Sequence, residues 1–204
     1  TIAPAVRVAA QDAQGNTLAS FTGAVSVAIG ANPAGGTLSG TTSVSAVAGV
    51  ATFADLSLNR AGGGYTLLAS GAGLSIATQT FTISPGAAAG LSFQAQPPAA
   101  TAGSALTPAV QVAALDNLGN VATGFVGAVT VALGANPGGA TLSGTTSTPA
   151  VGGVASFGTL SLDRTGVGYT LVASATPTLS AATSAPFDVA AGTAARLSVT
   201  TQPS

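Results

Sequence analysis

The sequence predicts an all-β fold built of two tandem β-sandwiches, and three observations support this prediction. Apolar residues alternate with polar or small ones at a period of two, as in Val110, Val112 and Ala114, which is the spacing of half-buried strands. Clusters of Gly, Asn, Pro or Ser separate these short runs, as turns separate the strands of a sandwich. The chain also repeats itself once, over the length of a small domain.

The repeat is continuous over most of such a domain. Residues 4–70 align with residues 108–174 without a gap, and 44 of the 67 aligned positions are identical. The period of about 104 residues is too long for a solenoid unit. We therefore expect a first repeat over 1–89 that lacks its first strand, a complete second repeat over 90–195, and the first strand of a following repeat over 196–204.

A short opening segment sets these boundaries. The sequence LSFQAQP at 91–97 opens the second repeat, LSVTTQP follows at 197–203, and the first repeat has no counterpart. Because a sandwich without its first strand exposes unpaired backbone and an apolar groove, we expect Leu197, Val199 and Pro203 to form an assembly strand that fits this gap in another copy. Two alternatives remain open: the next copy follows on one continuous chain, or it is a separate subunit that receives a donated strand.

Within the second repeat, the alternation predicts seven strands and one weaker segment. Despite the abundant Ala, no segment combines helical spacing with capping residues, and Thr, Val and Gly recur too often for a stable helix. The expected strands lie near residues 91–96, 109–116, 127–134, 140–144, 154–162, 168–174 and 184–189, and the weaker segment lies at 147–151.

A five-residue motif predicts the same turn in both repeats, as DAQGN at 12–16 and DNLGN at 116–120. The Asp side chain is expected to cap its own turn, and Gly to supply a positive φ. A calcium loop is the alternative, but calcium takes about six or more oxygens, and each repeat has only two or three widely spaced Asp. We therefore expect no metal site and assign structural roles to Asp12, Gly15, Asn16, Asp116, Gly119 and Asn120.

The composition excludes most chemistry. The ionisable side chains are four Arg, five Asp and two Tyr, and the chain has no Lys, Glu, His or Cys. Because these missing residues supply most general bases, nucleophiles and transition-metal ligands, we expect no enzyme activity, no catalytic residue and no cofactor. A net charge of −1 disfavours nucleic-acid binding, and no apolar run reaches the roughly 18 residues of a membrane-spanning helix.

Two arginines occupy equivalent positions in the repeats. Arg60 and Arg164 are the only charged residues besides Asp12 and Asp116 that both copies keep. Three interpretations remain open: they mark a ligand site, they form ion pairs with Asp12 and Asp116, or they brace the loop before the next strand. We favour a structural role, because isolated ion pairs are common in such loops.

The order of four motifs resembles that of the bacterial immunoglobulin-like repeats of large surface proteins, in the style of the invasin and intimin arrays. The motifs are DAQGN, TLSG, GVATF and GYTL, and the resemblance covers nearly the whole chain. They begin at residues 12, 37, 49 and 64 of the first repeat, and their counterparts begin at 116, 141, 153 and 168.

The resemblance implies immunoglobulin-like Greek-key β-sandwiches with about seven or eight strands per repeat. It also implies tyrosine corners at Tyr65 and Tyr169, where a phenol bonds back to nearby backbone. Finally, it implies an extracellular bacterial protein that serves as a stalk, an adhesin segment or a surface fibre.

The scarcity of charge predicts self-association. Soluble sheet proteins usually guard their edge strands with charged side chains, and only 4% of these residues are charged. We expect a structural repeat module of a bacterial extracellular filament or giant surface protein, whose partners are further copies of itself. The alternative is an adhesive module that recognises a carbohydrate or host receptor through its end loops.

Overall fold

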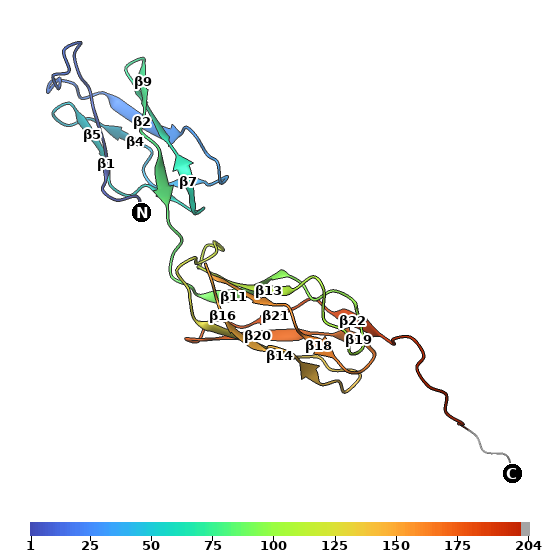
Figure 1. Cartoon of the computed structure of the whole chain (residues 1–204). Coiled ribbons are helices and arrows are strands. Elements are labelled where there is room, and N and C mark those ends of the chain that lie inside the picture. The colour runs from blue at the N-terminus through green and yellow to red at the C-terminus, as the bar shows by residue number, and fades with distance from the viewer. Residues whose placement is uncertain (201–204) are drawn as a thin grey trace. The chain divides into compact units, whose positions relative to one another are not determined.

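The computed structural model describes residues 1–200, which form strands and turns without a helix. The chain divides into two compact units, Thr1–Pro85 and Gly86–Ser204, called unit 1 and unit 2 below. Each unit is built of small and mostly antiparallel sheets (Figure 1), and these sheets surround one hydrophobic core. The all-β sandwich predicted from the sequence is therefore confirmed. No helix in residues 1–200 is long and apolar enough to cross a membrane.

Unit 2 is built of short strands, as its turn-rich sequence predicts. Four of them make the main sheet, in the order β16-β14-β20-β21, and three make the facing sheet, in the order β11-β13-β17. Two smaller sheets, β12-β22-β19 and β15-β18, complete the unit. The strands are β11 (Gly90–Ala95), β12 (Ala100–Thr101), β13 (Val110–Leu115), β14 (Ala128–Leu133), β15 (Leu142–Ser143), β16 (Ser147–Pro149), β17 (Val154–Phe157), β18 (Ser161–Leu162), β19 (Gly166–Tyr169), β20 (Leu171–Thr176), β21 (Ala182–Thr183) and β22 (Phe187–Ala190).

Two of the expected strands are each divided in the structure. The expected strand 154–162 becomes β17 and β18, and the expected strand 168–174 becomes β19 and the first part of β20. In both cases the chain leaves one sheet and enters another, since β17 pairs with β13 but β18 with β15. The second change of sheet occurs at Thr170, whose side-chain oxygen accepts a hydrogen bond from the Ala135 amide at 2.7 Å.

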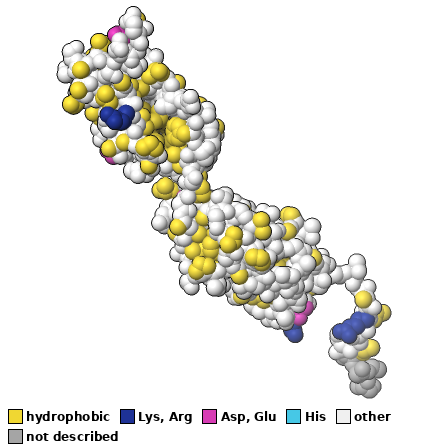
Figure 2. Space-filling model, turned by 60° about the vertical axis from the view of Figure 1, so that its left-hand side comes forward, with side chains coloured by type: hydrophobic (Ala, Val, Ile, Leu, Met, Phe, Trp, Pro, Cys, Tyr) yellow, Lys and Arg dark blue, Asp and Glu magenta, His cyan; other side chains and the backbone are white. Residues whose placement is uncertain are grey.

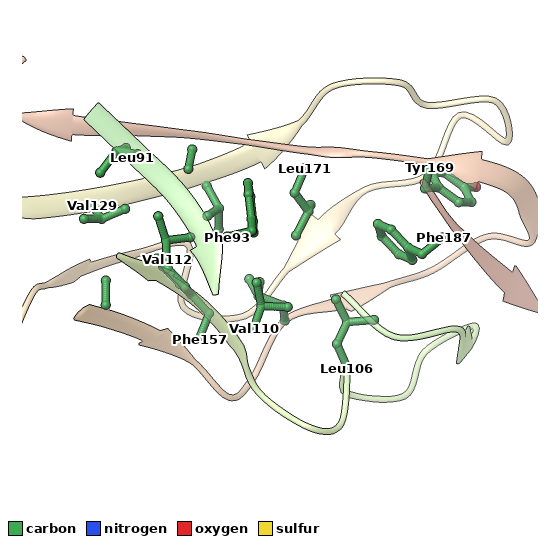
Figure 3. Close-up of a cluster of buried hydrophobic side chains, with 14 of the residues drawn as sticks. Leu91, Phe93, Leu106, Val110, Val112, Val129, Phe157, Tyr169, Leu171 and Phe187 are labelled. Carbon is green, nitrogen blue, oxygen red and sulfur yellow. The ribbon is translucent and has the colours of Figure 1, made fainter. Parts of the chain in front are cut away.

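The alternation of burial follows the predicted period. Strand β14 buries Val129 and Val131 and exposes the residues beside them, because successive side chains of a strand point to opposite faces. The core of unit 2 gathers residues from both facing sheets, and Figure 3 shows Leu91 and Phe93 of β11 among them.

Unit 1 repeats this architecture without counterparts of β11 and β12. Its sheets have the orders β4-β2-β8-β9, β1-β5, β10-β7 and β3-β6. The strands are β1 (Val6–Ala9), β2 (Ala24–Ile29), β3 (Leu38–Ser39), β4 (Ser43–Ser45), β5 (Val50–Phe53), β6 (Ser57–Leu58), β7 (Gly62–Tyr65), β8 (Leu67–Gly71), β9 (Leu74–Ala77) and β10 (Phe81–Ile83).

The difference between the units lies beside β1. By the sequence alignment, β1 corresponds to β13, which lies between β11 and β17. Strand β1 pairs with β5 on one side only, and no strand of residues 1–85 takes the place of β11. The consequence is a smaller core, with eight clustered buried residues in unit 1 against nineteen in unit 2.

Candidate functional site

The open side of β1 leads into an apolar groove on unit 1. The groove has a volume of about 370 Å³ and runs between β1 and the hairpin of β8 and β9. Hydrophobic side chains also gather on the face of unit 1 seen in Figure 2. Six of the apolar residues that line the groove are Val8, Leu18, Phe21, Val25, Leu74 and Ile76.

Unit 2 shows what fills the equivalent position. There β11 pairs antiparallel with β13, with Leu91 opposite Ala114 and Phe93 opposite Val112. Leu91 and Phe93 are themselves buried, at 9% and 8% exposure. The strand therefore closes the sandwich and supplies two large apolar side chains to its core.

The residues that β11 covers in unit 2 are uncovered in unit 1. Val112 and Ala114 have 0% exposure, whereas their counterparts Val8 and Ala10 are partly exposed. The neighbouring Ala113 is also fully buried, and its counterpart Ala9 is exposed. Unit 1 thus carries the interior surface of a sandwich without the strand that would shield it.

The opposite wall of the groove is a second free sheet edge. Strand β9 ends the four-stranded sheet of unit 1, and its Leu74 and Ile76 are 73% and 67% exposed. In unit 2 the corresponding edge touches β11, because the Leu91 amide donates to the Ser180 carbonyl at 2.9 Å. A strand in the groove would therefore meet hydrogen-bonding backbone on both sides.

The two Asp turns follow β1 in unit 1 and β13 in unit 2. Asp12 accepts hydrogen bonds from the backbone amides of Gln14 and Asn16, at 3.0 and 2.8 Å, and from the Asn16 side chain at 3.0 Å. Gly15 has a φ of 89°, which a residue with a Cβ rarely adopts. The Asn16 side chain is the main cause that lowers the pKa of Asp12.

Asp116 makes the same turn with one additional partner. It accepts from the Leu118 and Asn120 amides at 2.8 and 2.9 Å and from the Asn120 side chain, and Gly119 has a φ of 79°. The Gly86 amide, just before β11, adds a bond to Asp116 Oδ2 at 2.8 Å. Chiefly through the Asn120 side chain, these bonds lower the pKa of Asp116 to about 2, because they favour the charged carboxylate.

Pairing of arginine with these carboxylates, one of the three interpretations of Arg60 and Arg164, is not observed within residues 1–200. The groups that lower the pKa values of Asp12 and Asp116 are amides and Asn side chains of the turns, together with Gly86. Arg60 and Arg164 instead take part through their backbone carbonyls, which accept hydrogen bonds from buried tyrosines. The turns themselves thus supply hydrogen bonds to both carboxylates.

Both tyrosines bond back to the chain upstream of them, in the geometry of a tyrosine corner. The Tyr65 hydroxyl donates to the Arg60 carbonyl at 3.0 Å. The Tyr169 hydroxyl lies 3.1 Å from the Arg164 carbonyl and 3.2 Å from that of Thr165. Both rings are fully buried, so these residues fix a loop in the interior and do not present a binding surface.

The expected assembly strand has no partner strand in residues 1–200. Leu197 and Val199 lie beyond β22, outside any strand, and are 99% and 71% exposed. Pro203 lies outside the described residues.

Two features escaped the sequence analysis. Asp55 accepts hydrogen bonds from the Thr41 amide and hydroxyl at 2.9 and 2.8 Å, which lower its pKa. Comparison of the two repeats did not reveal this role of Asp55, because the equivalent residue of unit 2 is Thr159. There the Thr159 hydroxyl accepts the hydrogen bond from the Thr145 amide. The β9 wall of the groove was also missed, since the two copies diverge after residue 70.

No protein-family model matches the chain, and no curated protein matches it. Among solved structures, the chain is similar to domains 5–6 of the S-layer protein SbsC, with 20% sequence identity and a TM-score of 0.34. The similarity covers 92% of this chain and 88% of that chain.

Proposed function

We propose that this chain is a structural repeat module of a bacterial extracellular filament or giant surface protein, which provides reach and associates with its own copies. The observation that carries the proposal is the tandem pair of β-sandwich units in a chain with 4% charged residues. A duplicated unit without a new chemical group gains length or valency rather than a reaction. The proposal assigns the module no catalytic activity.

The use of the acidic residues supports a structural role. Asp12, Asp55 and Asp116 all direct their carboxylates at backbone amides of nearby turns. No group of three or more His, Cys, Asp or Glu that could hold a metal ion occurs in the described part of the chain. The charged groups thus hold turns in place, and none of these three is left to act on a ligand.

The exposed surface supports association. Large apolar side chains lie open to solvent, including Val47, Val151 and Val167 at 78%, 81% and 77% exposure. With few charges beside them, repulsion between copies is weak, and small side chains lose little conformational entropy on contact. Association in such a system depends on shape, backbone pairing and apolar contact.

The proposal is tested in the source organism with an antibody raised against unit 2. Labelling of intact cells followed by electron microscopy is expected to mark a fibre or a layer outside the cell. Labelling that appears only after the cells are broken would contradict the proposal. Antibody against a cytoplasmic protein of the same cells is the matched control.

A second test uses ionic strength. Because the chain has only nine side chains that are charged at neutral pH, four Arg and five Asp, the dissociation constant of its assemblies is expected to change less than about threefold from low to physiological salt. Sedimentation velocity measures this. If added salt dissolves the assembly, ion pairs hold it together and the argument from scarce charge is wrong.

A further inference from the structure

We infer that the free edge of β4 in unit 1 is a contact between copies of this chain, in which β4 pairs antiparallel with β4 of a second copy. The inference deepens the proposed function and rests on it, since it names a surface by which copies associate. The edge belongs to the repeat itself, because β16, the equivalent strand of unit 2, is likewise the last strand of its sheet.

Strand β4 directs every second pair of backbone groups away from its sheet. Among the described strands it pairs with β2 alone. Thr42 and Ala46, at its two ends, bond to β2 through their backbones at 2.8 and 3.0 Å. Because the hydrogen-bonded residues of an antiparallel pair alternate along each strand, the N–H and C=O groups of Ser43 and Ser45 point away from β2.

These outward groups are open to solvent. Ser43 and Ser45 are both exposed, and no other element of the described chain bonds to their backbones. The residues on either side are already paired: the Thr41 amide bonds to Asp55, and Val47 exchanges two backbone bonds with the residue three positions on. The free edge therefore consists of two donors and two acceptors.

The edge is complementary to itself. When two β4 strands pair antiparallel about Val44, Ser43 of each copy lies opposite Ser45 of the other. The outward groups then face one another, and each of the two Ser43–Ser45 pairs exchanges two hydrogen bonds. Val44 is half-buried and packs against the core of unit 1, so its pairing with Val44 of the second copy covers more of an apolar side chain.

The distribution of charge favours a second copy as the occupant. Natural edge strands usually carry charges that repel a like strand, and Ser43–Ser45 carries none. Asp55 lies beside the start of β4, where Thr41 binds its carboxylate through the amide and hydroxyl, at 2.9 and 2.8 Å. In the antiparallel pair Thr41 lies opposite Val47 of the second copy, so the two Asp55 carboxylates do not face each other.

Unit 2 shows how the same edge is blocked. In β16, Ser147 and Pro149 stand where β4 has Ser43 and Ser45. Proline has no N–H, and its ring occupies the outward position. A pair of β16 strands would therefore lose two of the four hydrogen bonds and press each ring against the opposite backbone. Of the two equivalent edges only that of β4 is open, so pairing through it joins two chains and goes no further.

The test exchanges the edge residues between the units and measures association by sedimentation equilibrium. The parent is expected to dimerise. Ser45→Pro gives unit 1 the residue of unit 2 and is expected to weaken dimerisation at least about 10-fold, because two hydrogen bonds are lost. Pro149→Ser is the matched reverse variant, and it is expected to form assemblies larger than dimers because each chain then has two open edges. Calorimetry checks that unit 1 of Ser45→Pro remains folded.

Charge exchange tests the register without proline. The variant with Ser43→Asp and Ser45→Asp places like charges opposite each other, as does the variant with Ser43→Arg and Ser45→Arg, and each is expected to be monomeric alone. Their mixture is expected to dimerise, since Asp then lies opposite Arg. The matched control carries Ser147→Asp and Ser174→Asp, which add the same charges at exposed sites of unit 2, and it is expected to dimerise like the parent.

Hydrogen exchange of the Ser43 and Ser45 amides reports the contact directly, and both are expected to gain protection in the dimer. The inference is overturned if the parent stays monomeric up to about 1 mM, where even a weak specific contact forms dimers. It is also overturned if Ser45→Pro dimerises like the parent, if the mixed charge variants stay monomeric, or if both amides exchange freely in the dimer. The proposed function is decided separately from all of these outcomes, by surface labelling.

Discussion

Replacing Tyr169 by Phe isolates the hydrogen bond that pins the loop before β19. The ring is fully buried and packs against Phe187, with the ring centroids 6.0 Å apart, and Phe keeps this packing. What is lost is one hydroxyl proton shared between the Arg164 and Thr165 carbonyls, at 3.1 and 3.2 Å. A Cβ on Gly138 would collide with the phenol oxygen, so the backbone there lies close against it and restricts the access of water.

The expected cost follows from leaving these carbonyls without a donor. A lost hydrogen bond that leaves a buried group unsatisfied costs about 1–3 kcal/mol, so we expect Tyr169→Phe to lower the free energy of unfolding of unit 2 by ~2 kcal/mol. For a unit of this size that corresponds to a fall of about 10 °C in Tm.

The assay is differential scanning calorimetry of the full chain, supported by tyrosine fluorescence. The chain has two Tyr and no Trp, so in Tyr169→Phe the remaining fluorophore is Tyr65, which reports unit 1 and should be unchanged. Tyr65→Phe is the matched variant and should lower the transition of unit 1 instead. A loss below about 0.5 kcal/mol in unit 2 would show that the carbonyls find other donors, and the tyrosine-corner reasoning would be refuted.

Three further predictions concern unit 2. Gly119 and Gly153 have nearly equal φ angles of 79° and 80°, but a Cβ meets nothing within 4 Å at Gly119 and lies 2.5 Å from the Ala122 carbonyl oxygen at Gly153; Gly119→Ala should cost about 1 kcal/mol and Gly153→Ala at least twice as much by urea denaturation, and equal losses would contradict the assigned collision. The pKa of Asp116 is lowered from 3.8 to about 2, so its carboxylate contributes stability above pH 4 that is lost as the pH falls towards 2; calorimetry should show this decline in the parent and a weaker one in Asp116→Asn, and identical pH profiles would speak against it. Phe93→Ala should destabilise unit 2 by about 3 kcal/mol, whereas Val199→Ala at the equivalent position should leave the monomer unchanged in the same assay, and a large effect of Val199→Ala on the monomer would place that residue in a core.

The sequence predicted the strands well wherever burial decides the pattern. Val129 and Val131 alternate with exposed neighbours because the pleat of a strand forces a period of two. The same reasoning could not divide the expected strand 154–162, since Phe157 and Leu162, on the two sides of the break, face one shared core. The alternation of apolar and polar residues indicates which side chains are buried, but it does not indicate which sheet a strand joins.

Two short strands of unit 2 could not be predicted from the sequence pattern. Strands β12 and β21 are two residues long, which is too short for any periodicity. They form because β12 pairs with β22 and β21 pairs with β20, and this pairing depends on tertiary structure. The interpretations of Arg60 and Arg164 stayed open for a related reason: a sequence shows that charges recur but not that the Asp turns already use both carboxylates.

The sequence predicted the candidate site because the first repeat lacks the opening segment, and the structure showed which residues line it. The missing LSFQAQP opening in the first repeat implied an unpaired edge at β1, because a strand with one neighbour has free backbone groups on its other side. Leu74 and Ile76 could not be assigned to the opposite wall, since they lie beyond the region where the copies align. The hairpin they belong to turns at Ala72, which has a φ of 50°, whereas the matching pair in unit 2, β20 and β21, is joined by the longer loop 177–181.

The two copies therefore act as an internal control for what the first strand contributes. Val8 and Val112 are the same residue in the same motif, yet one is partly exposed and the other fully buried. The local sequence cannot explain this difference, because the flanking residues are also nearly identical. Its cause is the strand beside them, so the completeness of a sandwich in this architecture depends on a segment that precedes the unit. A ligand that binds only the folded state stabilises it by mass action, and a strand that pairs with the open edge of β1 would act in the same way. The stability of each unit therefore depends on whether a strand is paired with this edge.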